Sequence, residues 1–130
     1  MSWFGGPDDD GVDPDEPLAF IFDVMEAPQL FLPYQPDGTS GLARRLNPHT
    51  HYLACRWNYD LTPRELLLQE KALVRSLKTG IALTAFPSDW GPNDNTGRIA
   101  DLSPGLMADL GIITDDEVEI VFPYEEEGIV

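Results

Sequence analysis

The chain contains a single cysteine, Cys55, so no disulfide within it can hold the fold together. Basic residues are also scarce: 8 lysines and arginines stand against 23 aspartates and glutamates, which gives a formal charge of −15 at pH 7. Binding of a polyanion needs a concentrated basic face, so the sequence predicts no nucleic-acid partner. Long hydrophobic runs are missing too. The apolar stretch 18–25 is short and contains Asp23, so we expect no membrane insertion.

The negative charge is concentrated at the two ends of the chain. Residues 1–27 hold eight acids and no lysine or arginine, and residues 115–130 hold seven acids and none. The middle of the chain, residues 28–114, has eight of each sign and is neutral. Acidic ends of this kind repel DNA and membranes, and we expect them to be solvated or to contact other proteins.

The amino end shows no secretory leader. It begins Met-Ser-Trp-Phe-Gly-Gly and continues with acids, without a basic lead or an apolar core of the right length. The expected location is therefore the cytoplasm by default, or a virion if the chain is phage-encoded.

The length of 130 residues indicates one folded domain. Residues 1–17 are rich in Asp, Gly and Pro, and we predict a flexible acidic tail there. Residues 18–48 are predicted to be an N-terminal extension, in which 18–25 forms either an extra strand or a docking segment. The folded barrel is expected at 49–124, and residues 125–130 are expected to form an acidic C-terminal tail.

Hydrophobic patterns predict several short strands and a short helix. The helix is marked by Ser103 as its cap, by Pro104 in its first turn and by Gly111 after its end. The predicted strands cover residues 52–57, 81–86 and 118–122. High Pro and Gly content with short strands and brief helices indicates a mainly β fold, most simply a small barrel.

A second short helix is predicted between the first two strands. Thr62 is a favourable cap, Pro63 suits the first helical position, and Glu65 completes a capping box. Thr79-Gly80 would end this helix. Its apolar side would consist of Leu66, Leu67, Leu73, Val74 and Leu77.

Two aspartates bracket a glycine-rich stretch in the second half of the chain. Asp89 begins the sequence Asp-Trp-Gly-Pro, and Asp101 lies in Arg-Ile-Ala-Asp-Leu-Ser. Between them are an aromatic platform, Trp90, and a cation, Arg98. An acid, an aromatic ring and a cation this close in sequence are ingredients of a carbohydrate-binding groove. They are equally compatible with an ordinary loop that leads into a helix.

The order of these motifs resembles the double-psi β-barrel of the rare lipoprotein A family. The matching segments are Asp-Trp-Gly-Pro at 89–92, Gly-Arg-Ile-Ala-Asp-Leu-Ser at 97–103 and Leu-Gly at 110–111, within a likeness that covers about residues 50–122. The resemblance implies a six-stranded double-psi barrel with two short helices and a groove for a linear polysaccharide. Relatives include peptidoglycan lytic transglycosylases, expansins and barwins.

The resemblance also implies roles for the two aspartates. In the catalytic relatives, the aspartate of the Asp-Leu-Ser segment serves as general acid, and this position corresponds to Asp101 here. Asp89 is the supporting candidate. A burial-raised pKa would fit a carboxyl for proton donation, and a lytic transglycosylase needs only one such acid because a substrate hydroxyl attacks in place of water.

Four further residues are predicted to contact substrate. Trp90 would stack on a sugar face and Arg98 would pair with a substrate carboxylate, while Trp57 and Tyr59 would add an aromatic wall. Structural roles stay open for each of them: the aromatic residues can pack in the core, and Arg98 can pair with an Asp101 that merely supports the start of the following helix.

Metal and cofactor sites are not predicted. His49 and His51 would face the same way on a strand, but two histidines in a Pro-bounded loop are usually incidental. Cys55 lies in an apolar run and is expected to fill the core.

Two functions remain in competition. The first is a barrel of the lytic transglycosylase type that binds or cleaves the glycan strand of peptidoglycan, with a phage virion or a secretion assembly as its route of delivery. The second is a non-catalytic structural or interaction module, such as a virion or tail component, that uses the same barrel as a scaffold. Its protein contacts would come from residues 18–48 and the acidic ends.

Overall fold

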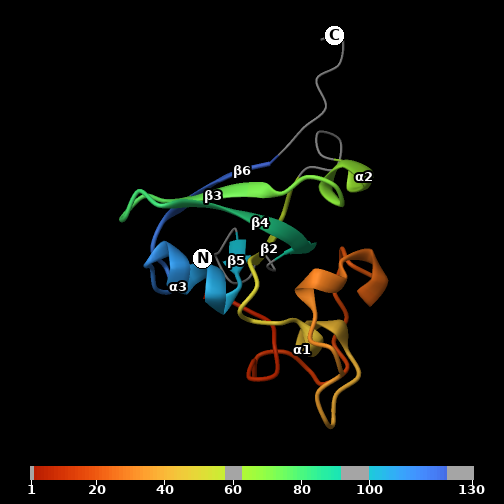
Figure 1. The fold of residues 1–130 in the computed structure, drawn as a ribbon. Helices are drawn as coiled ribbons and strands as arrows, with labels where there is room; N and C mark the ends of the chain where they lie inside the picture. Colours follow the sequence, from red (N-terminus) through yellow and green to blue (C-terminus); the bar gives the residue numbers. More distant parts are fainter. Residues whose placement is uncertain (1, 58–62, 92–99, 123–130) are drawn as a thin grey trace.

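The computed structural model describes residues 2–57, 63–91 and 100–122 of the chain (Figure 1). The strands are β1 (Ser2–Trp3), β2 (Tyr52–Cys55), β3 (Ala72–Ser76), β4 (Ala82–Asp89), β5 (Ala100–Leu102) and β6 (Val118–Val121). The helices are α1 (Leu42–Arg45), α2 (Arg64–Leu67) and α3 (Pro104–Leu110), with 3-10 turns η1 (Val24–Glu26) and η2 (Pro28–Leu30). Across the described ranges, no helix is both long and apolar enough to cross a lipid bilayer.

The six strands form one mixed sheet in the order β1-β5-β2-β4-β3-β6. β2 runs parallel to β4 and antiparallel to β5, β1 runs parallel to β5, and β3 is antiparallel to both β4 and β6. The sheet is strongly curled (Figure 1). Within the part of the chain that is described, β1 and β6 are its two edges, so the predicted six strands are confirmed but the sheet is not a closed barrel.

Each face of the sheet has its own hydrophobic core, as the alternation of side chains along β2 shows. Leu53 points toward α3 and packs with Leu102 and Leu106, whereas Tyr52 and Ala54 point to the opposite face. That opposite face is covered by the N-terminal segment. The covering residues include Phe4, Leu18, Phe20, Ile21, Leu30, Phe31 and Leu46.

α3 confirms the predicted short helix and its caps. The Ser103 hydroxyl oxygen accepts a hydrogen bond from the Leu106 N–H at 3.1 Å, and Gly111 follows the helix with a φ of 72°. Gly105 lets the first turn approach the preceding loop, because a Cβ there would lie 2.8 Å from the carbonyl oxygens of Pro48 and His49. The helix is therefore fixed tightly against that loop.

The helix predicted to begin at Thr62 and end at Thr79-Gly80 is confirmed only in its first part. The structure has only the single turn α2, followed by strand β3, while Thr62 lies outside the described residues. The reason is a period-two pattern in the second half of the segment: Ala72, Val74 and Ser76 are buried, and the residues between them are exposed. The pairing partners of β3, strands β4 and β6, are distant in sequence and override the local helical pattern. Gly80, with a φ of 77°, belongs to the β3–β4 hairpin turn rather than to a helix end.

The N-terminal residues contribute to the fold. Ser2–Trp3, within the segment predicted to be a flexible tail, pair with β5, and Phe4 is buried against Tyr52 with ring centroids 5.0 Å apart. The stretch 18–25 does not add a strand: it docks on the sheet through the buried residues Leu18, Phe20 and Ile21 and ends in η1. In Figure 1 the orange part of the chain and α1 accordingly lie together on one side of the sheet.

Candidate functional site

The structure brings Asp89 and Asp101 onto one face of the sheet. Both residues are register partners of Ala54 on β2, Asp101 from β5 and Asp89 from β4. Side chains of register partners point to the same face, and neighbouring strands lie about 4.8 Å apart, so the two aspartate Cα atoms are about 10 Å from each other. We call Asp89, Ala54 and Asp101 the acid row.

A β-bulge in β4 aligns the acid row. Leu53 pairs with Pro87 and Ala54 pairs with Asp89, so Ser88 is an extra residue in β4 without a partner position in β2. The Ser88 hydroxyl donates a hydrogen bond to the Leu53 carbonyl oxygen at 3.2 Å. Without the bulge, Asp89 would pair with the next residue of β2 after Ala54, and its side chain would point to the other face of the sheet. The bulge therefore places the carboxyl of Asp89 on the same face of the sheet as the carboxyl of Asp101.

The environment of Asp89 opposes ionisation. Burial raises the pKa of its carboxyl to about 6, and the negative charges of Glu16 and Asp101 act in the same direction. Hydrogen bonds from the backbone N–H groups of Ala19 and Trp90 oppose this rise; the Ala19 nitrogen lies 2.6 Å from Oδ1. Asp89 is thus partly protonated at mildly acidic pH.

Asp101 is half-buried at the middle of β5, between the buried residues Ala100 and Leu102. The alternative predicted for Asp101 was support of the start of α3. Ser103 has that role instead, because its side chain caps the helix. Asp101 is therefore positioned by the strand pairing with Ala54.

The two described tryptophans near the acid row differ in exposure. Trp90 is 41% exposed, and its indole N–H donates a hydrogen bond to the Trp57 carbonyl oxygen at 2.9 Å. Trp57 is only 5% exposed, packs edge-on against Phe20 at 5.2 Å and lies 5.6 Å from the Phe122 ring centroid. Trp57 is a core residue, the alternative that the sequence left open, while the Trp90 ring is accessible. Arg98 and Tyr59 lie outside the described residues.

One wall of the site comes from the N-terminal extension, which the sequence did not include in the site. The Ala19 N–H donates a hydrogen bond to the carboxylate of Asp89, and the Ile21 N–H donates one to the Ser88 carbonyl oxygen at 3.3 Å. Arg64 holds this segment in place: its Nη2 donates to the Phe20 carbonyl at 3.0 Å and lies 2.7 Å from Oε2 of Glu26. The pKa of Glu26 is lowered because the Arg64 guanidinium donates to it.

The histidines and the cysteine have structural surroundings. His51 Nε2 lies 2.7 Å from Oδ2 of Asp109, which accounts for one ring nitrogen. Among the described residues no group of three or more His, Cys, Asp or Glu side chains is placed to hold a metal ion. Burial raises the pKa of the Cys55 thiol, which disfavours the reactive thiolate.

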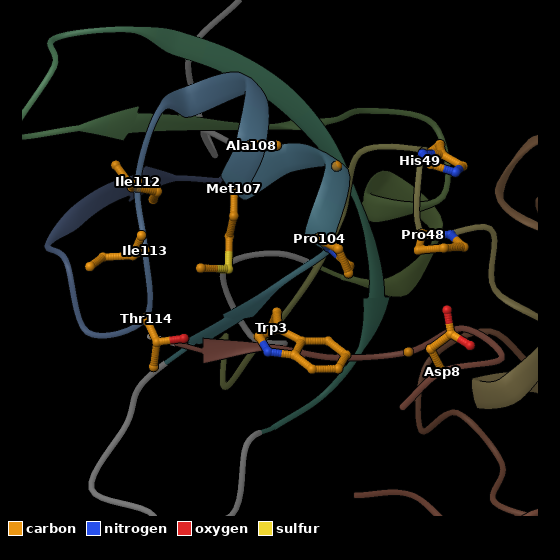
Figure 2. Close-up of a pocket in the computed structure, with 12 residues that line it drawn as sticks. Trp3, Asp8, Pro48, His49, Pro104, Met107, Ala108, Ile112, Ile113 and Thr114 are labelled. Atoms are coloured by element: carbon orange, nitrogen blue, oxygen red, sulfur yellow. The ribbon is translucent and has the colours of Figure 1, made fainter. Parts of the chain in front are cut away.

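A separate hollow of about 650 Å³ lies on the α3 side of the sheet (Figure 2). Trp3 lines it and pairs with Leu102, whereas the preceding residue, Ser2, pairs with Asp101. Successive strand residues point to opposite faces, so the hollow and the acid row lie on opposite sides of β5. Nothing in the sequence pattern predicted this hollow, because its lining comes from three distant segments around residues 3–8, 48–49 and 104–114.

No protein-family model matches this chain, and comparisons with curated proteins and with solved structures found no match. The curled six-stranded sheet is compatible with a barrel fold. Membership of the rare lipoprotein A family remains a prediction from the motifs.

Proposed function

We propose that this chain is a cell-wall glycan-binding protein whose curled, open sheet is related to the double-psi barrel of the rare lipoprotein A type. The observation that carries the proposal is the acid row: two carboxylates face one side of the sheet, and the exposed Trp90 ring follows directly after one of them. Glycan sites commonly combine hydrogen-bonding carboxylates with an aromatic platform. Residues elsewhere in the fold serve to align these groups.

The Trp90 ring is suited to stacking because its orientation is fixed. Its indole N–H is bonded to the Trp57 carbonyl, and Trp57 itself is anchored in the core. A ring that is already ordered loses little conformational freedom when a sugar packs against it. Trp90 is therefore proposed to supply apolar contact area, and the acid row to supply polar contacts.

The acid row also supports a cleavage step. Breaking a glycosidic bond requires a proton donor at the leaving oxygen. Asp89, with a pKa of about 6, retains a protonated fraction near neutral pH, and Asp101 occupies the position that resembles the general acid of the catalytic relatives. Asp89 thus joins Asp101 as a candidate acid, and the second carboxylate would stabilise positive charge on the sugar in the transition state.

A sacculus assay tests this proposal. Purified protein is incubated with peptidoglycan sacculi, and the sedimented protein and the released muropeptides are measured together. We expect wild type to sediment with sacculi and Trp90→Ala to sediment at least about fivefold less, the loss typical of a stacking contact. Release of anhydro-muropeptides that disappears in Asp101→Asn would identify a lytic transglycosylase, and binding without release would identify a glycan-recognition module.

The matched control is Asp37→Asn, which removes an exposed aspartate from the turn that follows Pro36. This variant should bind and release as wild type does. Sedimentation that is equal for wild type and Trp90→Ala, or that is absent in both, would contradict the glycan proposal.

A second candidate function is a non-catalytic interaction or structural module, for which the N-terminal extension provides the specific observation. Residues 18–21 pack over the end of β4, and the backbone of Ala19 uses one oxygen of Asp89. A carboxylate whose oxygen accepts a hydrogen bond from the backbone of its own chain is suited to stabilising the fold. This candidate predicts neither binding nor release with sacculi, together with a protein that copurifies in a stoichiometric assembly. A monomer that copurifies with nothing would count against it.

A further inference from the structure

The hollow on the α3 side has apolar walls that come from both ends of the folded chain. Met107 points from α3 toward the Trp3 ring, Ile112 and Ile113 border one side, and Pro48 and Pro104 border the other (Figure 2). Trp3 is 43% exposed and Ile113 is 68% exposed. Large apolar side chains are therefore accessible on two sides of a concave surface, an arrangement typical of a binding site for an apolar group.

Acidic side chains lie on two sides of the hollow. Asp8 lines it in Figure 2, and it belongs to the base-free segment 1–27 with eight acids. Thr114 lines the opposite side and is followed by Asp115, Asp116 and Glu117, of which Asp116 pairs with Lys78 at 3.5 Å. Acidic residues therefore flank the hollow on two sides, and no lysine or arginine is among its described lining residues. A ligand with positive charge is favoured there, whereas nucleic acids and anionic lipid surfaces are repelled.

From this combination we propose that the hollow binds a short segment of a partner protein, in which a large apolar side chain is flanked by lysine or arginine. The apolar anchor enters between Trp3, Met107 and Ile113, and the flanking cations face Asp8 and the acidic stretch after Thr114. A volume of about 650 Å³ accepts more than one side chain, so a peptide segment fits better than a single residue. Apolar anchors provide affinity at such sites, and complementary charge provides orientation and a faster association.

This site goes beyond the glycan proposal and is independent of it. The acid row lies on the opposite face of β5, so substitutions in one site leave the side chains of the other in place. Loss of peptide binding with intact sacculus binding, or the reverse, therefore distinguishes failure of one proposal from failure of the other.

The test uses a panel of short synthetic peptides with the full chain. Each peptide has a central Trp, Leu or Met flanked by lysines; matched peptides carry glutamates in place of the lysines, or Ser in place of the central residue. Binding is measured by fluorescence polarisation and mapped by two-dimensional NMR of the ¹⁵N-labelled protein. We expect at least one lysine-flanked apolar peptide to bind with a Kd of about 1 mM or tighter and to shift the signals of Ala108, Ile113 and Thr114. Added salt should weaken this binding.

Two variants with matched controls locate the contacts. Ile113→Ser should weaken the lysine-flanked peptides by about five- to tenfold, the loss expected for one partly buried aliphatic contact. Met25→Ser, at a side chain that is 78% exposed and outside the hollow, should have no effect. Asp8→Asn should weaken the same peptides by about two- to fivefold, as for an exposed charge pair, and Asp37→Asn should not. NMR spectra of the free variants verify that each one is folded.

Three results with the peptides would overturn the proposal. They are the absence of signal shifts at the hollow with every lysine-flanked peptide, equal binding of the lysine and glutamate series, or binding that Ile113→Ser and Met25→Ser reduce equally. Shifts that appear with vesicles of anionic lipid but not with the peptides would also overturn it, because they would assign the surface to a membrane.

Discussion

Replacing Asp89 by asparagine should stabilise the folded protein at neutral pH. Asp89 is half-buried at the end of β4, and the pKa of its carboxyl is raised from its ordinary value of 3.8 to about 6. Asparagine has the same shape, keeps an oxygen that can accept the hydrogen bond from the Ala19 N–H, and carries no charge to bury. The substitution therefore removes the cost of ionisation while it keeps the local contacts.

The magnitude follows from the two pKa values. The interval from 3.8 to about 6 corresponds to about 3 kcal/mol, at about 1.4 kcal/mol for each pH unit. This figure is an upper limit, because the Ala19 N–H bonds a carboxylate more strongly than an amide oxygen. We expect Asp89→Asn to be more stable than wild type by about 1–3 kcal/mol at about pH 8.

The pH dependence has a defined sign. Because the folded-state pKa of Asp89 lies above the unfolded one, the folded protein holds this proton at pH values where the unfolded chain has released it. Folding of wild type therefore becomes less favourable as the pH rises from about 4 to about 6, and the cost is constant above that range. The advantage of Asp89→Asn should be greatest at about pH 8 and should fade toward about pH 4.

Urea unfolding of wild type and variant, followed by far-ultraviolet circular dichroism at pH values from about 4 to about 8, measures this difference. Asp37→Asn serves as the control and should show a difference that does not change with pH in this way. If Asp89→Asn were instead less stable at about pH 8, with a gap that narrows on acidification, the hydrogen bonds to the carboxylate would outweigh its burial and the reasoning would be refuted.

Three further substitutions have expected effects on stability, each measured by the same unfolding assay. Tyr52→Phe should destabilise by about 1–3 kcal/mol, because the buried Tyr52 hydroxyl donates to the Phe4 carbonyl at 2.7 Å and its loss leaves that carbonyl unpaired; an unchanged midpoint would exclude this role. Gly105→Ala should destabilise by about 1–3 kcal/mol despite the better helix propensity of alanine, because the added Cβ meets the Pro48 carbonyl, and a stabilised variant would show that α3 can shift freely. Arg64→Met should cost about 1–2 kcal/mol and accelerate amide hydrogen exchange across residues 20–26, and unchanged exchange there would show that this guanidinium does not anchor the segment.

The elements that were predictable from sequence carry local signals. α3 has Ser103 before it and Gly111 after it, and both residues act as the caps that their types indicate. The predicted strands at 52–57, 81–86 and 118–122 correspond to β2, β4 and β6, with ends that differ by a few residues. Each of these segments has turn residues or apolar runs of its own.

The elements that were missed depend on distant partners. β1 has only two residues and no pattern of its own, and it exists because β5 offers an edge for pairing. β3 was assigned to a helix because Leu73 and Leu77 fit a helical spacing, yet both are exposed in the strand and turn that form instead. Local propensity cannot report the antiparallel pairing with β4 and β6 that decides this segment.

The same distinction holds for the site. The sequence identified Asp89, Asp101 and Trp90 as residues of interest, and their types alone justify that selection. It could not show that Asp89 and Asp101 share one face, because that depends on the bulge at Ser88. Pro87, directly after the predicted strand 81–86, was the available signal, since proline in or beside a strand often marks a bulge or an edge. The contribution of Ala19 to the site had no signal in the sequence.

The most direct test of the glycan proposal is a titration of the ¹⁵N-labelled protein with soluble peptidoglycan fragments, observed by two-dimensional NMR. The account predicts that the Trp90 indole signal and the backbone signals of Asp89 and Asp101 shift as the fragments bind, while the signals of Ile113 and Thr114 in the hollow stay in place. Shifts confined to the hollow, or no shift at a fragment concentration of about 10 mM, would contradict the assignment of the acid row as the glycan site.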